Sequence, residues 1–196
     1  ALTSYMARRP EIKKVYLINQ DYAFGHSEEK AAEEYLKRKR PDVQVVGKDR
    51  HPLAQVRDFA PYVAKIKAAG ADTIITGNWG ADLALLVKAA RDAGLTANFY
   101  TYYAGTTGVP TAMGAAGEDH VRQVSYWHPN VPNPKADPIV QGFHQKFKDD
   151  YYVMATYTGF RLLGEAMKKA KSTDPLKVAL AMEGMKIESL NGEVEM

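Results

Sequence analysis

Aromatic side chains, rather than catalytic groups, dominate the segments of this chain whose residue types could do chemistry. Tyr22 and Phe24 follow one run of strand-forming residues, Trp79 follows a second, and the pair Tyr102 and Tyr103 ends a third. Aromatic rings at the ends of strands offer a small molecule apolar contact, stacking and cation–π attraction. The pattern favours binding of a flat or apolar ligand.

The motifs of common catalytic sites are absent from the sequence. The histidines are scattered without metal-ligand spacing, no glycine precedes Lys-Ser or Lys-Thr, and no serine lies in a nucleophile elbow. A dinucleotide site is disfavoured because Gly25 stands alone after its strand, and the helix that follows carries Glu28 and Glu29, which would repel a pyrophosphate. We therefore expect no enzyme activity, no catalytic residue, no metal site and no cofactor.

Composition narrows the class further. The chain has 196 residues, 45% of them hydrophobic, no cysteine and a net charge of +3. No apolar run approaches the ~20 residues that span a membrane. The basic cluster from Lys37 to Arg40 ends a predicted helix, where it complements the helix dipole, and this use is favoured over nucleic-acid binding.

Strands and helices alternate along the first two thirds of the chain. The predicted elements, in order, are a helix over 1–10, a strand over 15–18, a helix over 27–40, a strand over 43–47, a helix that Asp58 caps and that stops at Gly70, a strand over 72–76, a helix over 81–93, a strand over 98–102, a short helical segment over 113–117 and a strand over 121–126. This order predicts an α/β fold with an open parallel sheet flanked by helices on both faces. Ligands of such sheets lie at the carboxyl ends of the strands.

The composition changes at Trp127, where a segment rich in proline begins. Three helices are predicted beyond it, over 138–149, 153–171 and 174–184, followed by a hairpin over 188–196 with an Asn191-Gly192 turn. We place a domain boundary between 127 and 128, so that 1–127 and 128–196 form separate domains. Neither end has the look of a complete chain, which favours a fragment.

Several motifs resemble one family in order and spacing over nearly the whole chain. They are DYAFGH, TGNWG, AARDAGL, GEDHV and ATYTGFRLLGEAM. Together they resemble the Leu/Ile/Val-binding proteins, which are solute-binding components of ABC importers with the type I periplasmic-binding fold. The resemblance implies a two-lobed protein that closes on a ligand, with 1–127 as the second lobe and 128–196 as the hinge crossing, with helices and a hairpin that pack on the first lobe.

The same resemblance implies the setting of the protein. It predicts a precursor with a signal peptide, a location in the periplasm or anchored by lipid outside a Gram-positive cell, a membrane permease as partner, and a monomer when complete. Its second-lobe ligand contacts fall on three loops, so the predicted ligand-binding residues are Tyr22, Phe24, Asn78, Trp79, Tyr102 and Tyr103. At most one of Tyr102 and Tyr103 should face the ligand, because adjacent strand side chains point opposite ways.

The position of Tyr103 decides the expected ligand class. Amino-acid-binding relatives carry a glutamate there against the ligand's ammonium group, and a buried ammonium without a counter-charge is costly. We therefore expect an aromatic or other non-amino carboxylate, with a branched-chain or other amino acid next. Asp21 remains open as a substitute counter-charge, helped by cation–π contact with Trp79 or Tyr103.

Other interpretations remain open from sequence alone. Tyr22 and Phe24 can instead pack under the helix that follows them, and Trp127 and His128 can line a hinge or a solvated linker. A ligand-sensing domain or an α/β enzyme of the same fold is the alternative function.

Overall fold

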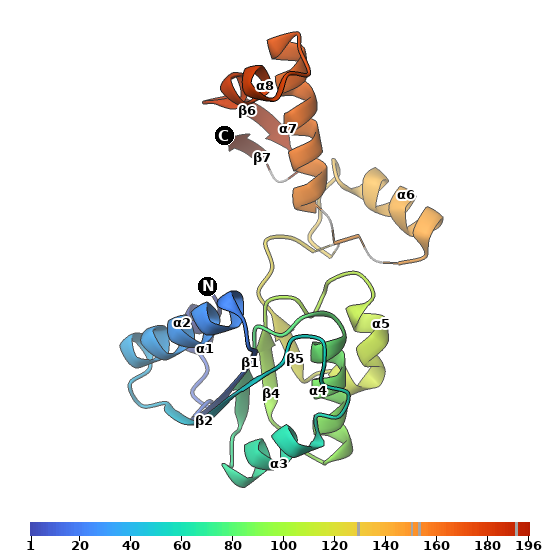
Figure 1. The fold of residues 1–196 in the computed structure, drawn as a ribbon. Helices are drawn as coiled ribbons and strands as arrows, with labels where there is room; N and C mark the ends of the chain where they lie inside the picture. Colours follow the sequence, from blue (N-terminus) through green and yellow to red (C-terminus); the bar gives the residue numbers. More distant parts are fainter. Residues whose placement is uncertain (129, 150, 153, 191) are drawn as a thin grey trace. The chain divides into compact units, whose positions relative to one another are not determined.

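The chain forms two compact units. The computed structural model describes residues 1–128, 130–149, 151–152, 154–190 and 192–196 (Figure 1). One unit comprises Ala1–Ser125 and the other Tyr126–Met196. No helix among the described residues is long and apolar enough to cross a membrane.

The first unit is built on a parallel sheet of five strands. Their spatial order is β2-β1-β3-β4-β5, and every neighbouring pair runs parallel. The strands are β1 Lys14–Gln20, β2 Gln44–His51, β3 Thr73–Ile75, β4 Asn98–Thr101 and β5 Val121–Gln123. The open parallel sheet expected from the alternating pattern is confirmed.

Helices cover both faces of this sheet (Figure 1). Leu17 and Ile18 show why, since successive strand side chains enter opposite cores. Leu17 packs with α1 (Leu2–Met6) and α2 (Ala23–Lys39). Ile18 belongs to the core that also contains residues of α3 (Ala60–Ala68), α4 (Gly80–Asp92) and α5 (Val109–Met113). A 3₁₀ turn, η1 Gly114–Gly117, follows α5.

The helix after β1 begins at Ala23, four residues before the predicted start. Gly25 permits this early start, because a Cβ at that position would lie 1.9 Å from the Gln20 carbonyl oxygen. The predicted helix over 27–40 placed Glu28 and Glu29 in its first turn. Because the helix begins earlier, neither residue is in the first turn, and both are buried. Phe24 therefore belongs to a helix rather than to a loop.

Several other helix and strand boundaries differ from the predicted ones. β2 continues to His51, beyond the predicted end at Gly47, because its residues keep pairing with β1 up to Gln20. α1 stops at Met6 instead of Pro10. The N-cap residue of α3 is Phe59 rather than the predicted Asp58, although Asp58 Oδ1 accepts a hydrogen bond from the Ala60 backbone N–H, 2.8 Å away. β5 ends at Gln123, before the predicted limit.

The second unit contains three helices and an antiparallel hairpin among its described residues. They are α6 Asp137–Phe147, α7 Met154–Ala170, α8 Pro175–Met182, β6 Lys186–Ser189 and β7 Gly192–Glu195. The predicted helices and hairpin are thus present. Val153, the expected start of a helix, and Asn191, half of the expected turn, lie outside the described residues.

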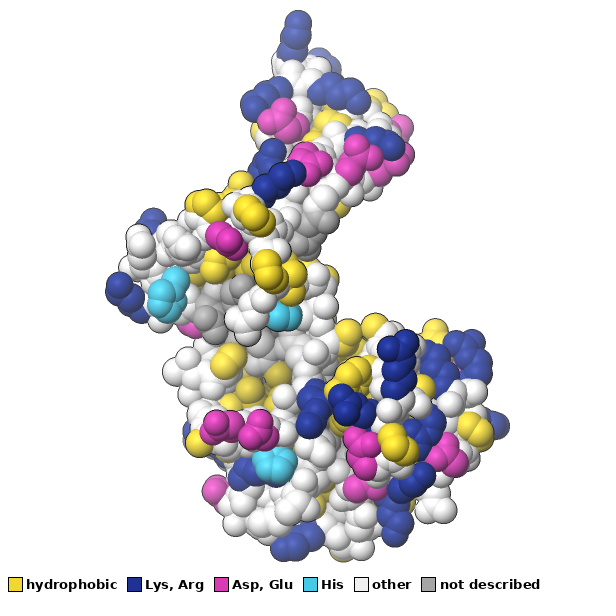
Figure 2. Space-filling view, turned by 180° about the vertical axis from the view of Figure 1, so that it is seen from behind, with side chains coloured by type: hydrophobic (Ala, Val, Ile, Leu, Met, Phe, Trp, Pro, Cys, Tyr) yellow, Lys and Arg dark blue, Asp and Glu magenta, His cyan; other side chains and the backbone are white. Residues whose placement is uncertain are grey.

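Acidic and basic side chains are interspersed on the surface. Figure 2 shows Lys and Arg side chains lying among Asp and Glu side chains on the visible face. Lys37, Arg38 and Lys39 occupy the last turn of α2, as expected of residues that complement the helix dipole.

Candidate functional site

The candidate site lies where the strand order reverses. The chain leaves β1 for β2 on one side and then returns to β3 on the other side of β1. At such a point the segments after two neighbouring strands diverge and leave a crevice at their carboxyl ends. Tyr22 follows β1 and is the N-cap residue of α2, while Trp79 follows β3 and is the N-cap residue of α4. Two equivalent positions of adjacent strand–helix units therefore carry aromatic side chains.

Rings from three loops and helix starts meet at this crevice. The Trp79 indole Nε1–H donates a hydrogen bond to the Tyr22 hydroxyl, with 2.9 Å between the two atoms. The Phe24 ring centroid lies 6.1 Å from that of Tyr22, 5.7 Å from that of Tyr103 and 6.5 Å from that of Tyr102. These distances are typical of edge-to-face and tilted aromatic contacts. Five of the six predicted residues thus form one cluster.

A hollow of about 460 Å³ opens beside this cluster. It is lined by Tyr22, Trp79, Gly80, Tyr103, Thr106, Thr107 and Val109. None of these side chains carries a charge. Trp79 is 42% exposed, so the ring presents a large apolar face to solvent. An apolar hollow with a few hydroxyl groups is typical of small-molecule binding sites.

Asn78 has a different environment from the rings. It is fully buried, and its Nδ2 lies 2.8 Å from His51 Nε2. Because an amide nitrogen is a donor, this His51 nitrogen accepts, and Nδ1, 3.2 Å from the Pro52 carbonyl oxygen, carries the hydrogen. Asn78 therefore holds the loop in front of Trp79 and does not line the hollow.

Hydrogen bonds to Asp82 connect further segments at the same edge of the sheet. The Asp82 carboxylate, buried near the start of α4, accepts from Gln20 Nε2 at 2.7 Å and from the Ala54 backbone N–H at 2.9 Å. One carboxylate oxygen thus joins the end of β1, the segment after β2 and α4. Charge-assisted bonds of this kind hold backbone positions firmly.

A buried polar cluster lies beneath the rings. Asn19 Oδ1 accepts a hydrogen bond from the Gly77 backbone N–H at 2.7 Å, which joins β1 to the loop after β3. Gly77 has no room for a side chain, because a Cβ there would lie 2.9 Å from Phe24 Cε1 and 3.3 Å from Glu28 Cγ. Close approach of Phe24 to the sheet therefore depends on this glycine.

Glu28 is the most perturbed acid of the cluster. It is 5% exposed, and neither carboxyl oxygen has a hydrogen bond of good geometry among the described residues. Burial raises the pKa of Glu28 to about 7, with a smaller contribution from Glu29, whereas the Asn19 amide and the Tyr102 hydroxyl beside it oppose the rise. The same burial, with Glu28 next to it, raises the pKa of Tyr102. Glu28 thus keeps its proton well above the usual range of a carboxyl.

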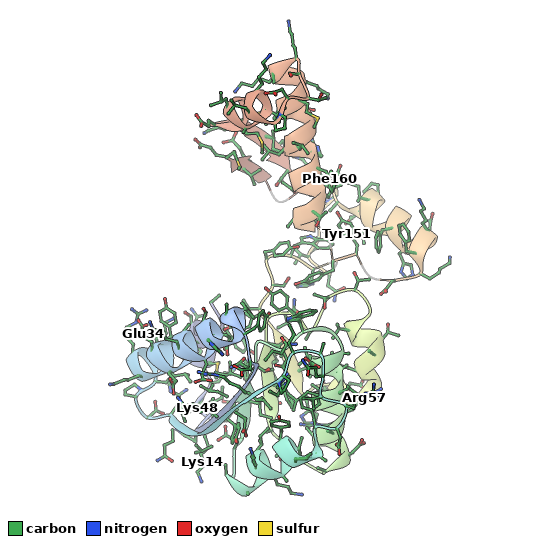
Figure 3. All side chains as sticks on the ribbon, in the orientation of Figure 1. Lys14, Glu34, Lys48, Arg57, Tyr151 and Phe160 are labelled. Carbon is green, nitrogen blue, oxygen red and sulfur yellow. The ribbon has the colours of Figure 1, made fainter. Side chains whose placement is uncertain are left out.

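Glu29, next to Glu28 in the sequence, is ionically paired. Arg50 Nε donates to Glu29 Oε2 and Arg50 Nη2 donates to Glu29 Oε1, each at 3.0 Å. Lys48 of β2 (Figure 3) lies 3.4 Å from it. These cations satisfy Glu29 at the outer side of the cluster, so the two neighbouring glutamates have opposite electrostatic environments.

Asp21, the proposed substitute counter-charge, already has a partner. Its carboxylate lies 2.6 Å from His26 Nε2, and this hydrogen bond lowers the pKa of Asp21. Asp21 is not among the residues that line the hollow. Asp21 is thus bonded to His26 rather than exposed along the hollow.

Sequence reasoning missed two groups of residues. Thr106, Thr107 and Val109 line the hollow but were not predicted; their position in the segment after β4, beside Tyr103, is the signal that marks them. Glu28 was treated as a first-turn acid, although it stands at i+4 from Phe24 and therefore shares its helix face. Within the described residues there is no cluster of three His, Asp or Glu side chains that could hold a metal ion.

The first unit is an α/β sheet with an apolar hollow at the carboxyl ends of its strands. The sequence model of the family described as "Periplasmic binding protein" matches residues 1–196. The chain belongs to this family. The family and the type I periplasmic-binding fold expected from the sequence motifs are therefore confirmed.

Similar proteins support the assignment. Leu/Ile/Val-binding protein homolog 4 of Brucella abortus (strain 2308) is 34% identical over 195 residues, which cover 94% of this chain and 45% of that protein. The leucine-, isoleucine-, valine-, threonine- and alanine-binding protein of Brucella ovis, in a closed conformation, superposes with a TM-score of 0.81 and 31% identity over 100% of this chain and 51% of its own.

A solute-binding protein of an ABC transporter from Rhodopseudomonas palustris HaA2, solved with p-hydroxybenzoic acid, has a TM-score of 0.79 and 26% identity over 98% of this chain and 54% of its own. The chain thus spans about half the length of these relatives.

Proposed function

We propose that this chain is the second-lobe half of a solute-binding protein that serves an ABC importer. The observation that carries the proposal is the uncharged aromatic hollow at the carboxyl ends of β1, β3 and β4, in a chain of the periplasmic binding protein family. The relatives named above are binding proteins. The residues that line the hollow include no Asp, Glu, His, Lys or Arg. The protein binds and releases its ligand without chemistry, in the periplasm or anchored outside the cell.

The two units take different roles in this proposal. Unit 1 is the second lobe and presents Tyr22, Phe24, Trp79 and Tyr103 to the ligand. Unit 2 returns to the first lobe, whose ligand contacts come from outside this chain. Ligand held by the first lobe allows the rings to bury against it, so the closed state is populated to the extent that the ligand prefers it. A membrane permease then recognises the closed form.

The proposed ligand is an aromatic or other non-amino carboxylate, with amino acids next. An ammonium group against this wall would meet rings and threonines but no carboxylate, and Asp21 is engaged by His26. Desolvating an unpaired ammonium costs several kcal/mol, roughly the penalty of an unpaired buried ion, and cation–π contact offsets only ~1 to 2 kcal/mol. The relative solved with p-hydroxybenzoic acid supports this class, whereas the Brucella relatives are named for amino acids.

A thermal-shift screen of the full-length protein tests the proposal. The panel contains benzoate, 4-hydroxybenzoate, short aliphatic acids, amides and branched-chain amino acids. A ligand that binds only the folded state raises the melting temperature with its affinity and concentration. We expect aromatic acids to give the largest shift. A shift confined to amino acids would contradict the ligand class but keep the binding function, and turnover of a substrate without any shift would contradict the binding function.

A further inference from the structure

The hydrogen bond between Trp79 and Tyr22 leaves a donor unused. An indole N–H can only donate, so the Tyr22 oxygen is the acceptor in their 2.9 Å contact. The Tyr22 hydroxyl hydrogen is therefore not used by Trp79, and no acceptor for it exists among the described residues. Both side chains line the hollow. The Tyr22 hydroxyl thus remains able to donate a hydrogen bond to whatever fills the hollow.

The neighbouring hydroxyl has the opposite capacity. Thr106 Oγ1 donates to the Tyr103 carbonyl oxygen at 2.8 Å, so only its lone pairs remain for a ligand. The hollow therefore combines a donor from Tyr22, an acceptor from Thr106 and apolar ring faces. A neutral group that both accepts and donates, set on an aromatic ring, matches this combination.

The absence of charge along the hollow fixes which end of a ligand lies here. Its lining contains Tyr22, Trp79, Tyr103, two threonines, a valine and a glycine, and no cation that could pair with a carboxylate. A buried carboxylate without such a partner is costly. The carboxylate must therefore face away from this wall, and the uncharged end of the ligand faces Tyr22.

We propose that Tyr22 is the specificity-determining residue of this wall: its hydroxyl donates a hydrogen bond to a hydroxyl group on the ring of an aromatic carboxylate, opposite the charge. This inference rests on the proposed function. The wall consequently selects hydroxylated aromatic acids over the unsubstituted acids. Trp79 and Tyr103, the other aromatic residues that line the hollow, supply ring contact to both classes.

Calorimetric titration of the full-length protein with benzoate and 4-hydroxybenzoate tests the inference. The measured quantity is the ratio of the two affinities. A net hydrogen bond between neutral groups corresponds to about a 3- to 10-fold preference. The wild-type protein should prefer 4-hydroxybenzoate by this factor. Tyr22→Phe should reduce the ratio to about 1 while leaving benzoate affinity little changed, because the ring stays in place.

Tyr35 provides a matched control for the Tyr22 hydroxyl. Tyr35, on α2, is 40% exposed and lies outside the lining of the hollow. Tyr35→Phe removes an equivalent hydroxyl and should leave the ratio unchanged. Equal wild-type affinities for the two acids, or a preference that survives Tyr22→Phe, would overturn the proposed role of Tyr22 but not the proposed ligand class. Failure of both acids to bind the wild-type protein, with binding of an amino acid, would overturn the proposed ligand class together with this inference.

Discussion

Replacing Glu28 by glutamine should stabilise the protein, and the gain should grow with pH. Glu28 is buried beneath the ring cluster, and its pKa of about 7 exceeds the ordinary value of 4.5. Below the ordinary pKa the carboxyl is protonated in the folded and unfolded chains alike, so it costs nothing. As pH rises from 4.5 to about 7, the unfolded chain ionises while the folded chain keeps its proton, and stability falls. Above pH 7 the loss levels off.

The size of this loss follows from the two pKa values. The difference between about 7 and 4.5 corresponds to roughly 3 kcal/mol of unfolding free energy, at about 1.4 kcal/mol for a tenfold change. Glutamine has nearly the same shape, cannot ionise and occupies the same place beside the Asn19 amide and the Tyr102 hydroxyl. Glu28→Gln should therefore have little effect at pH 5 and stabilise by roughly 3 kcal/mol at pH 8.

Urea unfolding of the wild-type protein, Glu28→Gln and Glu34→Gln at pH 5 and pH 8 measures the effect. Glu34 lies exposed on the same helix (Figure 3), so its amide variant removes one charge without relieving burial. It should change stability by less than about 0.5 kcal/mol at either pH. A gain for Glu28→Gln that is equal at both pH values, or a matching gain for Glu34→Gln, would refute the argument that desolvation keeps Glu28 protonated.

Three further substitutions probe the hollow and the close packing around it. Trp79→Ala should weaken ligand binding by ~2 kcal/mol or more without unfolding the protein, as expected for an aromatic anchor; unchanged affinity by calorimetry would remove Trp79 from the site. Tyr103→Glu should shift preference toward amino acids by supplying the missing counter-charge, and no gain for leucine over benzoate would contradict that reasoning. Gly77→Ala should destabilise by about 1 to 3 kcal/mol and displace Phe24, whose Cε1 would lie 2.9 Å from the new Cβ; thermal unfolding at the wild-type midpoint would exclude this steric clash.

Local pattern was sufficient to predict the sheet and the positions of its loops. The apolar run that contains Leu17 and Ile18 and the periodic helices after each strand predict parallel order without any knowledge of long-range contacts. Because Tyr22 and Trp79 come directly after strands, their place at the carboxyl edge follows from the same pattern. Their contact with a ligand remains a prediction.

The features that sequence reasoning missed depend on contacts between distant segments. The start of α2 at Ala23 depends on how closely Gly25 approaches Gln20. The burial of Asn78 depends on its hydrogen bond to His51 of β2. A local pattern carries no information about either partner. The acid at Glu28 likewise looked like a first-turn charge until the helix start was known.

The N-cap positions of Tyr22 and Trp79 separate the proposed ligand contacts from the residues that stabilise the fold. Each residue has an extended backbone at the boundary between a strand and a helix, and neither side chain caps its helix. Exchanging these side chains leaves the strand ladders, the helical hydrogen bonds and both apolar cores in place. If Tyr22 and Trp79 contact the ligand as proposed, substitutions at these two positions can change the ligand specificity of a protein with this sheet without compensating mutations in its interior.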